Sequence, residues 1–146
     1  MAITQAIANA FKKQLLEGDQ NFKSSGGDVF KLALYTSSAT LNSATTAYAS
    51  TNEVANTGTY TAGGDPLAGQ NTSIASGVAI VDFADLSFTG VTLTARGALI
   101  YNTSSAVSNA AVCALDFGAD KTATSGTFTI QFPAFTTAAA ILRISG

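Results

Sequence analysis

Four aspartates form the only cluster of residues in this chain whose types could do chemistry. Asp82 and Asp85 follow one apolar segment, and Asp116 and Asp120 follow another, each in a short sequence containing Asp-Phe. If the two corners met, their carboxylate oxygens could bind Ca²⁺. Their spacing matches no EF-hand loop, and the aromatic platform that a glycosidase pair would need is missing. We therefore expect these aspartates to accept hydrogen bonds from backbone N–H groups in turns, with no metal or cofactor.

The groups needed for nucleophilic catalysis are also missing. The chain has no histidine, and none of its serines lies in a G-x-S-x-G sequence, so no activated serine is predicted. Cys113 lies in an apolar run without a neighbouring cation, which predicts a buried, unreactive thiol. The sequence GDPLAGQN (64–71) has the glycine spacing of a phosphate loop, but Gln70-Asn71 replaces the Lys-Ser/Thr pair. The sequence predicts a proline-containing turn there and a non-enzymatic protein overall.

The composition narrows the choice of partners. The chain has seven Lys or Arg and nine Asp or Glu residues, with a net charge of −2. No basic patch could follow a phosphate backbone, so no nucleic-acid partner is expected. No apolar run reaches the ~18 residues of a membrane span, and no signal peptide is evident, so we expect a soluble protein made in a cytoplasm. Small, weakly charged surfaces favour packing against other subunits, although a hydrated Ser/Thr surface would give the same composition.

Residues 3–17 have the apolar spacing of one amphipathic helix. Ile3, Ile7, Phe11 and Leu15 follow one another at four-residue intervals, which places them on a single stripe. Gly18 is suited to end the helix in a left-handed conformation. We expect this helix to pack on a β core, in preference to a membrane or another subunit.

The rest of the chain predicts strands. Apolar runs or alternation occur at about residues 29–35, 76–83, 86–102, 110–117, 126–133 and 139–145. Gly90 is placed for a bulge, and Phe128, Ile130 and Phe132 share the expected inward face. Short spacings without a βαβ rhythm predict one domain (1–146) that is mainly β. Over residues 28–146 we expect an antiparallel β-sandwich or jelly-roll-like barrel, with one N-terminal amphipathic helix.

The segment from about residue 37 to residue 77 is unlike the others. It is rich in small polar residues, its large apolar residues are too widely spaced for a helix, and a loop of this length usually marks function or disorder. Its composition is not charged enough for typical disorder. We expect an extended excursion with one or two short strands that forms a partner-binding surface. The candidate interaction residues are Leu41, Tyr48, Val54, Tyr60 and Leu67, with Arg96, which could pair with an aspartate or face a neighbouring subunit.

Several stretches resemble a set of small virion structural proteins of tailed bacteriophages. They are residues 30–64, VDFAD (81–85), TARGALIYN (94–102) and ALDFGADKTATSGTFTIQFP (114–133). The tract from Leu34 to Leu41 and the ARGALIYN segment are the most distinctive. The resemblance implies a non-enzymatic component of the phage particle, in the capsid or in the tail, and it brings no catalytic residues.

The first hypothesis is therefore a capsid cement or decoration protein. It would be made in the host bacterial cytoplasm, self-associate as a trimer and bridge subunits of the major capsid protein or other virion proteins. The alternative is a tail component, namely a fibre, tip or tail-completion protein, although fibre modules usually show repeats. A soluble host enzyme or carbohydrate-binding module is a third class, which calcium or sugar bound at Asp82 and Asp116 would indicate.

Overall fold

Two antiparallel sheets and one short helix make up the computed structural model, which describes residues 2–146. The prediction of a mainly β fold with a helix near the N-terminus is confirmed. The larger sheet has the strand order β1-β7-β6-β2-β3, and the small sheet has the order β4-β5-β8. The elements are β1 (Ala6–Ile7), α1 (Asn9–Glu17), β2 (Phe30–Tyr35), β3 (Asp65–Pro66), β4 (Asn71–Ala75), β5 (Val78–Asp82), β6 (Leu86–Asn102), β7 (Ala110–Ile130) and β8 (Leu142–Ser145).

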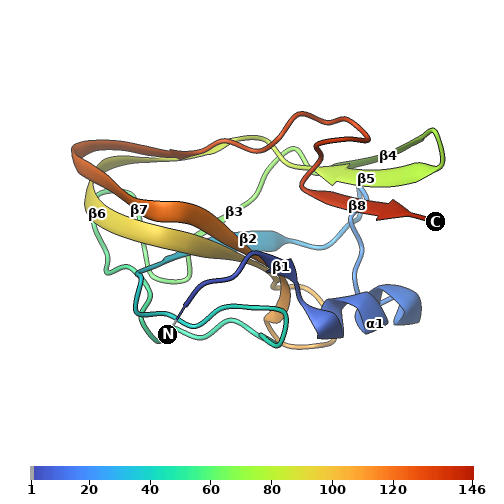
Figure 1. Ribbon diagram of the computed structural model, residues 1–146, viewed down its shortest axis with the longest axis horizontal. Helices are drawn as coiled ribbons and strands as arrows, with labels where there is room; N and C mark the ends of the chain where they lie inside the picture. The colour runs from blue at the N-terminus through green and yellow to red at the C-terminus, as the bar shows by residue number, and fades with distance from the viewer. Residues whose placement is uncertain (1) are drawn as a thin grey trace.

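A long hairpin of β6 and β7 forms the frame of the molecule. Register shifts interrupt the ladder, and one lies between Phe88 and Val91, where Gly90 has a φ of +61°. Bulges of this kind bend and twist a strand pair. In Figure 1 the paired strands bend together at the end of the molecule away from α1, and their upper arm runs back toward the small sheet. Both strands belong to the larger sheet, and the bend directs one arm of that sheet toward the small sheet.

The prediction of two separate strands at 110–117 and 126–133 is wrong, because β7 is one continuous strand, Ala110–Ile130. The polar residues between these runs stay in the ladder, since Lys121 pairs with Ala95 and Thr122 with Thr94. These residues are largely exposed, so the ladder continues there without a buried face to mark it in the sequence.

The prediction of a helix over residues 3–17 is wrong for its N-terminal half. Ala6 and Ile7 form β1 and pair with Ala114 and Cys113 of β7, and the helix begins only at Asn9. Two physical reasons favour the strand: β-branched isoleucines are stiff in a helix, and β7 would otherwise leave its edge unpaired. The helix ends as predicted at Gly18, whose φ is +79°.

A chain of phenylalanine rings joins the helix to both sheets. Phe22 stacks on Phe30 of β2 at 4.3 Å between ring centroids and meets Phe11 of α1 edge-on at 5.8 Å. Phe83, after β5, lies 5.9 Å from Phe30 and 5.8 Å from Phe132, after β7. Aromatic contacts of this kind contribute about 0.5–1.5 kcal/mol each beyond their burial. They connect the two sheets and α1 through one core.

The loop between α1 and β2 is held by buried polar groups. Asn102, at the end of β6, donates through Nδ2 to Gln20 Oε1 at 2.8 Å and to Asp28 Oδ2 at 2.7 Å. Gln20 Nε2 in turn donates to Gln14 Oε1 of α1 at 2.7 Å. Because leaving such groups unpaired would cost about 1–3 kcal/mol each, this network fixes the loop against the helix.

Candidate interaction surface

The aspartates do not come together as a metal site. Among residues 2–146, no three His, Cys, Asp or Glu side chains are placed to share a metal ion. Asp85 Oδ1 accepts a hydrogen bond from the N–H of Phe132 at 2.8 Å, and Asp116 Oδ1 accepts one from the N–H of Gly118 at 2.9 Å. These two carboxylates accept backbone N–H groups as the sequence favours. The expectation is wrong for Asp82, whose buried Oδ1 has no hydrogen-bond partner among the described residues.

Arg96 pairs with an aspartate, one of the two alternatives left open by the sequence. Its Nε lies 3.1 Å from Asp116 Oδ1. The Gly118 N–H, followed by the Arg96 guanidinium, holds the pKa of Asp116 below its usual range. Arg96 therefore stabilises the carboxylate at a register shift between β6 and β7.

Cys113 is a buried core residue of β7. Burial raises the pKa of its thiol to about 12, so little thiolate forms near neutral pH. We expect Cys113 to resist a thiol reagent in the native protein at about pH 8 and to react fully in denaturant. Mass spectrometry would measure the rate of labelling. If the native protein were labelled as fast as the unfolded chain, the result would contradict the observed burial.

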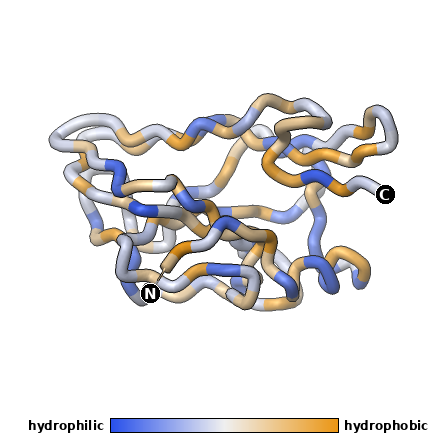
Figure 2. Tube along the Cα trace, viewed as in Figure 1, coloured by the Kyte–Doolittle hydropathy of each residue, from blue (hydrophilic) through white to orange (hydrophobic). Residues whose placement is uncertain are grey.

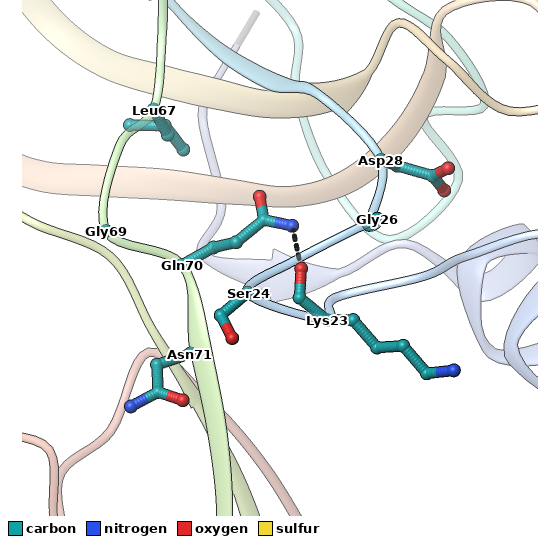
Figure 3. Close-up of a pocket in the computed structure, with 9 residues that line it drawn as sticks. Lys23, Ser24, Gly26, Asp28, Leu67, Gly69, Gln70 and Asn71 are labelled. Atoms are coloured by element: carbon teal, nitrogen blue, oxygen red, sulfur yellow. Dashed lines mark hydrogen bonds between the residues drawn. The ribbon is translucent and has the colours of Figure 1, made fainter.

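The phosphate-loop-like segment lines a small polar hollow. Gly69, Gln70 and Asn71 lie beside the loop from Lys23 to Asp28, around a space of about 500 Å³ (Figure 3). Gln70 Nε2 donates to the Lys23 carbonyl at 2.8 Å, and the Lys23 side chain extends away from Gln70 and Asn71. The cation that would have to reach a phosphate is thus not directed into the hollow, which is a junction between two loops.

The excursion at 37–77 contains β3 and β4 and is pinned to the protein's own sheets. Leu41, Val54, Tyr60 and Leu67 are buried in the common core, and Tyr48 is half-buried against it. This placement corrects the expectation that these five side chains contact a partner. Only the exposed residues between them are available to another molecule.

Glu53 organises the excursion, and the sequence interpretation missed it. Its Oε1 accepts hydrogen bonds from the Tyr60 hydroxyl at 2.7 Å and the Gly63 N–H at 2.6 Å, and its Oε2 accepts one from the Tyr48 hydroxyl at 2.6 Å. Tyr101 of β6 donates to the Gly63 carbonyl at 2.6 Å. The one available signal was that Glu53 is the only carboxylate in the stretch from residue 29 to residue 64.

The four tyrosines of the chain, Tyr35, Tyr48, Tyr60 and Tyr101, all lie around Glu53 and its hydrogen-bond partners. We call these groups the Glu53 cluster. Burial, followed by the charge of Glu53, raises the pKa of Tyr101 to about 12. Burial also raises the pKa values of Tyr35, Tyr48 and Tyr60 above the ordinary tyrosine value. Each hydroxyl is therefore held in its protonated form by the folded structure.

We expect alkali to unfold the protein and ionise its tyrosines together. An unfolded tyrosine has a pKa of about 10, so the folded chain holds these protons more tightly than the unfolded chain. The resulting stabilisation is complete below about pH 10 and is lost as the pH rises through the folded-state values. Tyrosinate absorbance and far-ultraviolet circular dichroism should change in one step. Ionisation centred near pH 10 with unchanged circular dichroism would contradict the buried cluster.

A groove of about 770 Å³ lies between α1 and the small sheet. We call it the α1–β8 groove. Phe11, Phe22 and Leu142 contribute buried apolar side chains to it. Leu16 and Ile144, which also line it, are 91% and 60% exposed. Figure 2 shows hydrophobic stretches on both walls, in α1 and in the strands of the small sheet.

One face of the small sheet extends the same apolar surface. Ile74 of β4 pairs with Ala79 of β5, which pairs with Ile144 of β8, so the three side chains form a row on one face. Ile74 is 73% exposed. Exposed apolar residues thus gather at the end of the molecule that holds α1 and the small sheet.

Comparison with known proteins gives no relative: no family model, no curated protein and no solved structure matches this chain. In the part of the chain that the structure describes, no helix has the length and apolar character needed to cross a membrane. Fold and surface define a small, mainly β protein with an apolar groove at one end.

Proposed function

We propose that the protein is a non-enzymatic structural component of a tailed-bacteriophage virion. Its role is that of a capsid cement or decoration protein, which binds the major capsid protein and stabilises the head lattice. The observation that carries this proposal is the exposed apolar row and groove formed by Leu16, Ile74 and Ile144. Soluble proteins that act alone rarely leave such side chains together in water, and clustered exposure of this kind marks an interaction site.

The rigid excursion supports the same role. Buried tyrosines and Glu53 hold the segment in one conformation, so docking its exposed residues would require little further ordering. Self-association as a trimer would repeat this surface around an axis, as expected for a subunit that contacts a symmetric lattice. The phage assignment itself rests on the sequence resemblance of residues 30–64, 81–85, 94–102 and 114–133.

The test is to locate and count the protein in purified virions of the phage that encodes it. We expect copies in proportion to the capsid lattice, density on the outer shell of the head, and heads that lose DNA at a lower temperature when the gene is deleted. Density only in the tail, at a few copies per particle, would assign it to the tail instead. Complete absence from the particle would reject a virion role.

A matched pair of variants links this test to the surface. Ile144→Asp changes an exposed residue of the groove, and Val107→Asp changes a residue in the β6–β7 turn, outside the groove. Both proteins should fold, because neither side chain is in the core. Ile144→Asp should fail to decorate particles that lack the wild-type protein, whereas Val107→Asp should decorate them normally.

A further inference from the structure

The α1–β8 groove combines an apolar interior with positive charge. Lys12, Lys23 and Arg143 line it, and no Asp or Glu does. Three of the seven cations in a chain of net charge −2 therefore border one groove. The ion pairs formed among residues 2–146 use Lys13 and Arg96, so these three cations are not neutralised by a carboxylate of the chain.

The polar contacts of these cations are to neutral atoms. Lys12 Nζ lies 3.4 Å from Asn9 Oδ1, and Arg143 Nη1 donates to the Thr137 carbonyl at 2.8 Å. A neutral acceptor leaves the charge of the cation in place, and an apolar surface next to it strengthens attraction to an anion. The chemistry complementary to this groove is therefore apolar and acidic.

The groove also runs along a free sheet edge. β8 is the last strand of the small sheet, and all four of its residues line the groove. An edge strand presents unpaired N–H and C=O groups that can pair with an extended segment of another chain. The neighbouring wall, α1, lies across the groove from the sheet in Figure 1.

We propose that the α1–β8 groove binds an extended segment of another protein, in which acidic and apolar residues alternate, and that this segment adds to the small sheet beside β8. Alternation fits because successive side chains of a strand point to opposite faces. The apolar residues would lie on the face of Leu142 and Ile144, and the acidic residues would lie on the opposite face, that of Arg143. The inference rests on the proposed function only for the source of the segment, another virion protein.

The test uses the full-length protein and a fluorescent peptide in which valine alternates with aspartate, followed by fluorescence anisotropy. We expect saturable binding at low ionic strength that weakens as salt is added. A peptide with lysine in place of aspartate should bind at least about tenfold more weakly. A peptide with an N-methyl group on every residue should also lose binding, because neither of its edges can donate hydrogen bonds to an edge strand.

The charge-reversal variants have a control on the same helix. Lys12→Glu and Arg143→Glu should each weaken binding of the aspartate peptide by about tenfold. Lys13→Glu should leave binding unchanged, because Lys13 is exposed, pairs with Glu17 and does not line the groove. All three residues are exposed, so thermal unfolding should show folded proteins.

Several outcomes would overturn the inference. They are no binding of the aspartate peptide at low salt, full binding of the N-methylated peptide, or an equal effect of Lys13→Glu. Self-association that Ile144→Asp abolishes would show that a second copy occupies the groove. Binding to phosphatidylglycerol vesicles that Lys12→Glu and Arg143→Glu abolish would show a membrane surface instead. If the protein bound the aspartate peptide but were absent from virions, the proposed function would be rejected. The inference that the groove binds an acidic and apolar segment would still hold.

Discussion

Gly64→Ala is expected to lower the free energy of unfolding by more than about 3 kcal/mol and to detach β3 from β2. Gly64 has a φ of +74°, a conformation that costs roughly 1–2 kcal/mol for other residues. A Cβ atom there would also overlap the carbonyl oxygen of Leu32. Since that oxygen belongs to the backbone of β2, the two strands must move apart, and the pairing of Leu32 with Asp65 is lost.

Alanine substitutions at Gly63 and Gly77 separate the cost of the positive φ from the cost of overlap with β2. Gly63 has a φ of +97°, and an added Cβ would lie 3.6 Å from the Tyr101 hydroxyl; Gly77 has a φ of +77° and nothing within 4 Å. Alanine at either position should cost only the conformational term, about 1–2 kcal/mol. Urea unfolding followed by circular dichroism measures all three. Equal losses at positions 63, 64 and 77 would refute the close approach to β2.

Glu53→Ala should cost about 3–4 kcal/mol, a large effect for a polar residue in a loop. The substitution leaves the hydroxyls of Tyr48 and Tyr60 and the N–H of Gly63 without their shared acceptor. Each unpaired buried group costs about 1–3 kcal/mol, and the partly exposed ones cost less. The excursion should loosen first, which hydrogen exchange at residues 50–63 would detect.

The controls for Glu53 are an exposed carboxylate and the tyrosines themselves. Glu17→Ala removes a solvent-exposed pair with Lys13 and should cost at most about 0.5 kcal/mol. In double-mutant cycles, Tyr60→Phe should recover part of the cost of Glu53→Ala, because the unpaired hydroxyl is then gone. A loss for Glu53→Ala no larger than that for Glu17→Ala would mean that the cluster does not hold the excursion.

Features set by local chemistry were predictable from the sequence. The bounds of β6 follow from the run of apolar and β-branched residues at 86–102, and Gly90 marks the irregular register there. Phe128, Ile130 and Phe132 are buried while the residues between them are exposed, because a half-buried strand alternates with period two. Gly18 ends α1 because a residue without a Cβ adopts a positive φ easily.

Features set by distant parts of the chain were not predictable. Ile3 and Ile7 fit a helical stripe as well as a strand. Distant partners decide between the two, since Ile7 pairs with Cys113 of β7 and Ile3 forms a bridge with Leu41. The central residues of β7 look like a loop until β6 is placed beside them. Glu53 gains its role only when Tyr48 and Tyr60 fold around it. The candidate residues of the excursion were predicted to contact a partner. Their spacing in the sequence does not indicate whether this protein or another one buries them.

The walls of the α1–β8 groove come from opposite ends of the sequence. One wall is built by residues of α1 and the loop after it, and the other includes β8, residues 142–145. Synthesis must therefore reach residue 145 before both walls exist. A partner that recognises the groove ignores nascent and truncated chains, however well their larger sheet has formed. Docking would then select molecules in which both α1 and the small sheet have formed.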